Sequence, residues 1–244
     1  MPQMPHGVLG EFLGTAILIL LGNGVVAGAL LRRSKAENAG WMAITTGWAL
    51  AVMAGVFTAM ACGSEGHLNP AVTIGAATVS GDYSNVGWYI GAQTAGAFVG
   101  AVLVWLHYLP HWWETPDADL KRACFCTAPA IRGPLANLIS EIIGTFVLVF
   151  VADAILSKTV ARTGPAAGLG PYLVGCVVWG IGLSLGGTTG YAINPARDFG
   201  PRIAHALLPI AKKEGSDWSY APIPVIGPMI GGVLAGLLAK TLGF

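Results

Sequence analysis

The tripeptide Asn-Pro-Ala occurs twice in this chain, at Asn69-Pro70-Ala71 and at Asn194-Pro195-Ala196, and each copy opens an apolar stretch too short to cross a bilayer. Asparagine is among the best helix-capping residues and proline is tolerated at the first helical position, so each tripeptide predicts the start of a helix. A helix that starts inside a membrane exposes unsatisfied N–H groups, which is tolerated only where it is buried in protein or lines a water-filled path. Two such starts, one in each half, predict a pore built from an inverted repeat.

The amino-acid composition is that of a membrane protein. Hydrophobic residues make up 54% of the chain, mean hydropathy is +0.66, and charged residues reach only 10%, against about 25% in ordinary soluble domains. The 35 glycines predict closely packed membrane helices, because glycine lets backbones approach each other. A formal net charge of +1 gives no reason to expect a nucleic-acid partner.

The apolar segments predict an all-α membrane protein with six transmembrane helices and two re-entrant half helices, arranged as an inverted repeat. The two half helices are too short to cross a hydrocarbon core of about 30 Å at about 1.5 Å per residue. The connection 109–134 contains His111, Trp112 and Trp113, which suit a membrane interface, and we expect it to cap one mouth of the pore. The expected full spans are 8–31, 41–62, 86–108, 135–157, 172–186 with its flanks, and 222–242, and the half helices are 69–80 and 194–207.

The two halves of the sequence also correspond outside the tripeptides. We interpret 1–244 as a single channel domain made of a first repeat, 1–115, and a second repeat, 130–244, because Glu11 and Glu141 stand at matching places in the two halves. Three membrane segments per repeat is an odd number, so consecutive repeats insert with opposite orientation. We expect both carboxylates to accept hydrogen bonds from the backbone of the re-entrant loops. The alternative is a proton relay for a coupled secondary transporter, which would need a chain of titratable groups.

Two longer motifs resemble a known family. The segments His67-Leu68-Asn69-Pro70-Ala71-Val72-Thr73 and 190–201, which runs Gly-Tyr-Ala-Ile-Asn-Pro-Ala-Arg-Asp-Phe-Gly-Pro, are similar to the two signature loops of the major intrinsic proteins, the aquaporins and glycerol facilitators. The resemblance covers the whole chain. It implies a passive channel rather than an enzyme, in the cell membrane and surrounded by the lipid bilayer, assembled as a homotetramer in which each protomer has its own pore.

The resemblance also implies a constriction that selects the solute. Its ring falls on Trp48, Gly182, Tyr191 and Arg197, a combination similar to the bacterial aquaglyceroporin branch, in which Gly182 leaves room for a polyol. The side chains of Trp48 and Tyr191 would face the carbon backbone and Arg197 would donate to hydroxyls. We therefore expect a channel for glycerol and other small uncharged solutes, with some water. The alternatives are a channel for neutral lactic acid or similar small hydroxy acids, because the stretch from 201–206 to 217–218 is similar to a bacterial branch that conducts them, or a channel mainly for water. Two features depart from the glycerol-facilitator pattern: Tyr191 stands where those proteins usually carry Phe, and the loop before His67 is longer and acidic.

The expected mechanism follows from the placement of dipoles. Asn69 and Asn194 would cap the half helices and donate N–H groups to each passing oxygen, while two helix N-termini and Arg197 repel cations and protons. Backbone carbonyls along the pore would accept hydrogen bonds from the solute. These carbonyls belong to Gly66, His67, Leu68, Gly190, Tyr191 and Ala192.

Several of these residues have a plainer interpretation. Trp48 could be an interface anchor, Tyr191 and Gly182 could serve packing alone, and His67 is better interpreted as a loop brace than as a proton switch. The sequence has no phosphate-binding, nucleophile-elbow or zinc-protease motif, so we expect no enzyme activity, no cofactor and no metal. The four cysteines are interpreted as structural thiols. The remaining histidines, His6, His107, His111 and His205, are expected at the surface or the interface.

Charge distribution and family resemblance disagree on orientation. The resemblance implies that both termini are cytoplasmic, whereas the positive-inside rule favours the opposite orientation. We follow the resemblance, since it rests on two long motifs. In that orientation Lys158, Arg162 and Lys240 lie inside, and Arg32, Arg33, Lys35, Lys121, Arg122, Arg132, Lys212 and Lys213 lie outside.

Overall fold

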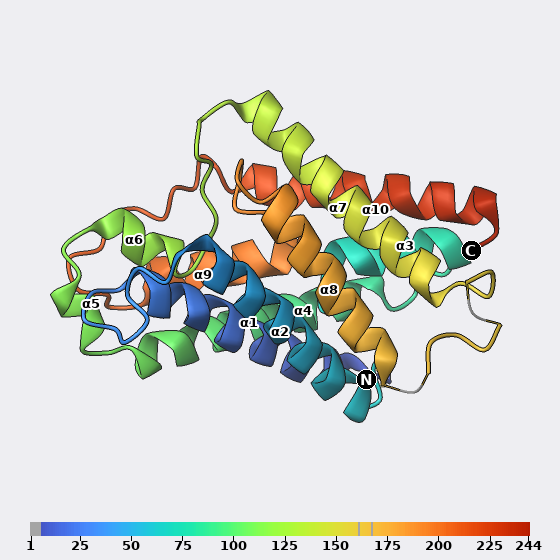
Figure 1. Cartoon of the computed structure of the whole chain (residues 1–244), viewed down its shortest axis with the longest axis horizontal. Coiled ribbons are helices and arrows are strands. Elements are labelled where there is room, and N and C mark those ends of the chain that lie inside the picture. Colours follow the sequence, from blue (N-terminus) through green and yellow to red (C-terminus); the bar gives the residue numbers. More distant parts are fainter. Residues whose placement is uncertain (1–5, 161, 167) are drawn as a thin grey trace.

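The computed structural model describes residues 6–160, 162–166 and 168–244. Within these ranges every regular element is a helix (Figure 1). The helices are α1 (Val8–Leu30), α2 (Gly40–Ala61), α3 (Pro70–Ser80), α4 (Val86–His107), α5 (His111–Glu114), α6 (Ala118–Ala123), α7 (Pro134–Leu156), α8 (Leu169–Ser184), α9 (Pro195–Leu207) and α10 (Pro222–Leu242).

Five of the described helices, α1, α2, α4, α7 and α10, are long and apolar enough to cross a membrane. The sixth expected span is α8, which has 16 residues and rises about 24 Å at about 1.5 Å per residue. The half helices α3 and α9 have 11 and 13 residues. With α8 counted as the sixth span, each half has three spans and one half helix, which agrees with the predicted fold class.

The long helices run roughly along the long axis of the molecule (Figure 1). The segment with α5 and α6 lies at one end, here called the connecting end, and both chain termini lie toward the other, here called the terminal end. The half helices α3 and α9 start in the middle of the molecule and run to opposite ends. Both helix starts therefore point toward the centre.

Each half helix packs mainly against the last long helix of the other half, so the halves interlock. Helix α3 contacts α10, and α9 contacts α4. A Cβ placed on Gly232 of α10 would lie 2.3 Å from the Ala71 carbonyl oxygen, and one on Gly200 of α9 would lie 2.8 Å from that of Thr94. Such distances exclude any side chain, so these contacts account for part of the high glycine content.

The connection between the halves folds over the connecting end, where the sequence predicts a cap (Figure 1). Trp113 is 71% exposed, as expected, but Trp112 is only 2% exposed. The Trp112 indole donates to the Trp105 carbonyl (2.9 Å), and its ring packs against Phe125, with ring centroids 5.6 Å apart. The predicted interface position of Trp112 is therefore wrong, because the segment turns inward to bury its aromatic side chains.

Candidate functional site

The starts of the two half helices are capped in the same way. The Asn69 Oδ1 atom accepts a hydrogen bond from the Ala71 amide (2.9 Å). The Asn194 Oδ1 atom accepts from the amides of Ala196 (3.0 Å) and Arg197 (3.2 Å). Pro70 and Pro195 each occupy the first helical position, where the missing N–H costs nothing. Each Asn-Pro-Ala tripeptide therefore starts a helix that is capped by its asparagine, as the sequence predicts.

The same two asparagines connect the halves of the molecule. The Asn69 Nδ2 atom donates to the Ile193 carbonyl (2.7 Å), and Asn194 Nδ2 donates to the Leu68 carbonyl (2.9 Å). Because an amide nitrogen carries two hydrogens, each asparagine keeps one N–H for another acceptor. The Leu68 carbonyl, predicted to accept from the solute, already accepts from Asn194 with one of its two lone pairs.

The two segments that lead into the half helices have irregular backbone. Positive φ angles occur at Gly66 (77°) and Leu68 (54°) in the first segment, and at Gly190 (76°), Tyr191 (38°) and Ile193 (42°) in the second. Positive φ at non-glycine residues is strained and persists only where surrounding contacts impose it. Both segments therefore need external support.

Glu11 supports the first segment. Its carboxylate accepts hydrogen bonds from the amides of His67 (2.9 Å) and Leu68 (2.7 Å), from Ser64 Oγ (2.5 Å) and from Gln93 Nε2 (2.7 Å). The side chain is fully buried, so these donors satisfy a carboxylate that has no access to water. Gln93 was missed at the sequence level, because nothing in its local pattern marks it.

Glu141 supports the second segment in the same manner. Its two carboxylate oxygens accept from the amides of Ala192 (3.0 Å) and Ile193 (2.8 Å). It is 1% exposed. The contacts of both glutamates are those expected for loop supports, and each carboxylate is occupied by fixed donors rather than by a chain of titratable groups.

A mostly apolar cavity of about 230 Å³ runs past the junction of the half helices. Trp48, Tyr191 and Arg197 line it toward the connecting end, and Asn69 and Asn194 line its middle. Toward the terminal end it is lined by Glu65, Gly66, His67 and Leu68, and further lining comes from Ala192 and from apolar side chains such as Val52, Val56 and Leu148. Pro70 and Pro195 together line a separate hollow of about 210 Å³, so they lie close together but outside this lumen.

His67 is held in place at the terminal end of the cavity. Its Nδ1 atom lies 3.2 Å from Thr73 Oγ1, and its Nε2 atom lies 3.2 Å from a carboxylate oxygen of Glu65. Two fixed partners favour the bracing interpretation of this histidine over a free proton switch.

Three of the four residues predicted to form a constriction, Trp48, Tyr191 and Arg197, come together at the connecting end of the cavity. The Arg197 guanidinium carbon lies 4.2 Å from the centroid of the Trp48 ring, a cation–π arrangement. Gly182 lies behind Tyr191: a Cβ on Gly182 would be 2.9 Å from the Tyr191 Cζ atom and 3.0 Å from Thr45 Cγ2. The space that Gly182 leaves is thus filled by the phenol ring, and the glycine affects the pore through the position of Tyr191.

The guanidinium of Arg197 is oriented by the connection between the halves. Its Nη1 atom donates to the Phe125 carbonyl (3.3 Å), and the same carbonyl accepts from Asn23 Nδ2 (3.2 Å). Phe125 and Asn23 are fully buried. Neither residue was predicted, because their contacts join positions far apart in the sequence.

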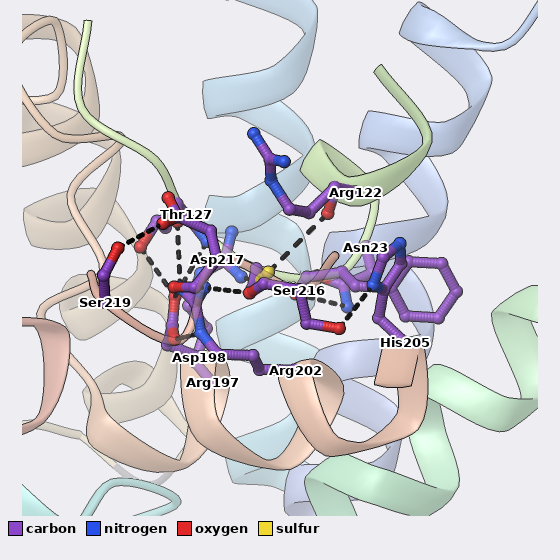
Figure 2. A network of polar contacts seen from close by, with 12 residues as sticks. Asn23, Arg122, Thr127, Arg197, Asp198, Arg202, His205, Ser216, Asp217 and Ser219 are labelled. Atoms are coloured by element: carbon purple, nitrogen blue, oxygen red, sulfur yellow. Dashed lines mark hydrogen bonds and ion pairs between the residues drawn. The ribbon is translucent and has the colours of Figure 1, made fainter. Parts of the chain in front are cut away.

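A buried ion pair lies directly behind Arg197. Figure 2 shows Asp198 and Arg202 of α9 beside Thr127; Arg202 Nε donates to Asp198 Oδ1 (2.7 Å), and the Thr127 amide donates to Asp198 Oδ2 (2.8 Å). Arg202 also donates to the Ser216 carbonyl (2.6 Å). Both charged side chains are 0% exposed. The pair therefore ties α9 to the segments 124–127 and 216–217.

His205 differs from its predicted surface position. It is 0% exposed, and its Nδ1 atom lies 2.8 Å from Ser216 Oγ (Figure 2). Its ring packs against Phe125, with ring centroids 5.4 Å apart. The prediction was wrong because the segment after α9 folds back over the end of that helix.

Metal ligation finds no support in the described residues. In that part of the chain no group of three His, Cys, Asp or Glu side chains could hold an ion. Cys124 and Cys126 are buried and free, whereas Cys62 is exposed. The site therefore offers hydrogen-bond donors, carbonyls and apolar walls as its means of acting on a solute.

Comparison with known proteins identifies this architecture. A family model described as Major intrinsic protein matches residues 2–239. The chain is 57% identical over 235 residues to a probable glycerol uptake facilitator protein from Thermotoga maritima, covering 96% of this chain and 98% of that protein. It is 56% identical over 237 residues to glycerol uptake facilitator protein 3 from Lactiplantibacillus plantarum, covering 96% of each.

A solved structure agrees with the sequence comparisons. The X-ray structure of the aquaglyceroporin from Plasmodium falciparum superimposes with a TM-score of 0.84 at 28% identity, covering 97% of this chain and 96% of that one. Both the family model and the superposition span nearly the whole chain. This multi-pass membrane protein therefore belongs to the Major intrinsic protein family.

Proposed function

We propose that the protein is a passive channel for glycerol and other small uncharged solutes, that it passes some water, and that it excludes ions and protons. Relatives more than half identical to it are named glycerol uptake facilitators. The single observation that carries the proposal is the constriction, where the Trp48 ring lies 4.2 Å from the Arg197 guanidinium carbon within one continuous cavity.

The two walls of this constriction suit the two sides of a polyol. Aromatic rings of Trp48 and Tyr191 accept CH groups through dispersion contacts. Arg197 has five N–H donors, and one of its nitrogens donates to the Phe125 carbonyl, so other donors remain for hydroxyl oxygens. A solute with carbon on one face and hydroxyls on the other fits this arrangement better than water alone does.

Ion exclusion follows from the charges around the lumen. The N-terminal ends of α3 and α9 direct positive partial charge toward the cavity, and Arg197 adds a full positive charge at the constriction. Carbonyls of Gly66, His67, Gly190, Tyr191 and Ala192 supply acceptors along the irregular segments. Successive weak sites exchange the solute's hydration stepwise without a deep energy well.

The assembly and topology are part of the proposal. We infer a homotetramer with one pore per protomer, in the cell membrane, with both termini cytoplasmic and with 1–115 and 130–244 as the two repeats of a single domain. Orientation is tested by labelling Trp113→Cys, at an exposed position of the connecting end, and native Cys62, which is exposed at the other end. Labelling of the introduced cysteine from the cytoplasm alone would contradict it.

Stopped-flow swelling of proteoliposomes tests the solute. We expect rapid swelling in a glycerol gradient, slower flux of lactic acid, and no dependence on a pH gradient; swelling no faster than in protein-free vesicles would refute the proposal. Faster flux of undissociated lactic acid than of glycerol would favour the hydroxy-acid channel, and pH-driven net uptake would favour a coupled transporter. Trp48→Ala should relax size selection, and unchanged selectivity would refute the assignment of the constriction.

A further inference from the structure

Trp41, in the first turn of α2, forms a hydrogen bond with the end of another membrane helix. Its indole Nε1 atom donates to the Gly182 carbonyl (3.0 Å). Gly182 lies in the last turn of α8, where helix carbonyls have no partner further along the helix. The bond therefore satisfies a carbonyl directly behind the constriction and joins the start of α2 to the end of α8.

The same indole contacts Tyr191. The two rings pack edge to face, with centroids 5.8 Å apart and planes at 82°. Gly186 lies against both rings, since a Cβ there would be 2.5 Å from Tyr191 Cδ1 and 2.7 Å from Trp41 Cζ2. Tyr191 is thus confined between Trp41 and the glycines at the end of α8.

Exposure separates Trp41 from the constriction residues. Trp48 and Tyr191 are 5% and 6% exposed, whereas Trp41 is 42% exposed, and Trp41 is not among the described residues that line the cavity. Any effect of Trp41 on the solute must therefore pass through Tyr191 and Gly182.

We propose that Trp41 is a positioning residue of the selectivity ring. It fixes the Tyr191 ring by edge-to-face packing, and its hydrogen bond to the Gly182 carbonyl holds the end of α8 behind that ring. Together these contacts set the width of the constriction. The inference rests on the proposed polyol channel and deepens it, because it names a further determinant of solute size.

Two substitutions separate the two contacts. Trp41→Phe keeps an aromatic edge against Tyr191 but loses the N–H donor, so the end of α8 behind that ring is held less firmly. Trp41→Ala removes both contacts, so Tyr191 can move outward and admit wider polyols. Met42→Ala is the matched control, since Met42 is in the same turn and is 62% exposed.

The test measures permeability ratios in proteoliposomes with equal amounts of incorporated protein. For Trp41→Ala we expect the ratio of five-carbon polyol to glycerol to rise about two- to tenfold, the range set by one edge-to-face aromatic pair. For Trp41→Phe we expect the same ratio to rise by a smaller factor, because one of the two contacts is kept. If the alanine variant does not assemble, the polyol ratio of Trp41→Phe decides.

Each other result counts against the inference. Ratios equal to those of the unaltered protein in both Trp41 variants, or an equal shift in Met42→Ala, would overturn the role of Trp41 and leave the glycerol channel intact. Absence of glycerol flux through the unaltered protein would overturn the proposed function, and the role of Trp41 with it.

Discussion

The two half-helix regions share one architecture but differ in charge. Both α3 and α9 are capped by an asparagine whose side chain also donates a hydrogen bond to the other half of the molecule. Both are preceded by an irregular segment that is held by a buried glutamate. Helix α3 carries no charged residue, whereas α9 carries Arg197, Asp198 and Arg202. The common part builds the central junction, and the charged part belongs to one end alone.

In the proposed channel, this difference assigns solute selection to the connecting end. The charges of α9 bind the segments 124–127 and 216–217 and place Arg197 against Trp48. The corresponding end of α3 is fixed mainly by Gln93, which donates to Thr73 Oγ1 (2.9 Å) and to Glu11. We propose that the inverted repeat keeps a symmetric centre while the constriction forms at one mouth alone.

Breaking the buried Asp198–Arg202 pair of α9 should lower the free energy of unfolding, and this is the largest effect that we expect. Arg202→Leu leaves Asp198 buried without its partner, and removal of one member of a buried pair typically costs about 3–5 kcal/mol. Arg33→Ala is the control at the same end, because its pair with Glu114 is exposed and such pairs contribute about 0–1 kcal/mol. Thermal unfolding in detergent measures both, and equal losses would contradict the structural role assigned to the α9 pair.

A negative charge at the central junction should weaken the exclusion of cations, and this is the next largest effect that we expect. Asn194→Asp places a carboxylate where the electropositive starts of both half helices meet. A unit charge about 4 Å from a passing cation at an effective dielectric of about 20 is worth about 4 kcal/mol, part of which Arg197 offsets. We expect cation conductance in planar bilayers that the unaltered protein lacks.

The neutral variant Asn194→Ala is the control for this experiment. It loses the hydrogen bond to the Leu68 carbonyl and the cap of α9 but adds no charge. Equal conductance in the two variants would show that the hydrogen bonds of Asn194, and not the added charge, decide whether cations pass.

Glu11 and Glu141, which support the two irregular segments, should contribute differently to the free energy of unfolding. Glu11 accepts from four donors, whereas Glu141 accepts from the two backbone amides named above and from the Thr189 side chain. Hydrogen bonds to a charged group are worth about 1.5–3 kcal/mol each. Glu11→Gln should therefore lower the free energy of unfolding by about 1–3 kcal/mol more than Glu141→Gln. Chemical denaturation of the purified variants gives the comparison, and the reverse order would refute it.

Features that depend on neighbouring residues could be predicted from the sequence. The asparagine caps, the half-helix starts and the two glutamates follow from local capping rules and from the repeat. Contacts that depend on chain reversal could not: Trp112 and His205 are buried because the segments that follow α4 and α9 fold back over the helix ends. Polar or aromatic character alone does not distinguish an interface position from such a buried one.

The disagreement between charge distribution and family resemblance has a structural component. The Lys121 ammonium is buried and donates to the carbonyls of Ala211 (2.5 Å) and Lys212 (3.1 Å), and burial lowers its pKa. Lys213 donates to the carbonyls of His205, Ala206 and Leu208, each at 2.7 Å, at the C-terminal end of α9, where positive charge is favourable. These lysines hold loops and helix ends together, a purpose that a count of positive residues cannot detect.

The smallest effect is expected for Tyr191→Phe, the one constriction position where this chain departs from the usual residue. Within the described residues the Tyr191 hydroxyl is buried and has no hydrogen-bond partner, so its removal deletes an unsatisfied group and leaves the ring between Trp41 and Gly182. We expect unchanged glycerol flux and a free energy of unfolding within about 1 kcal/mol of the original. Tyr108→Phe is the matched control, because the Tyr108 hydroxyl donates to the Gly24 carbonyl (3.2 Å) and its loss should cost about 1 kcal/mol. A marked fall in glycerol flux in Tyr191→Phe alone would show that this hydroxyl binds the solute, and would move part of the selectivity from the Arg197 wall to the aromatic wall.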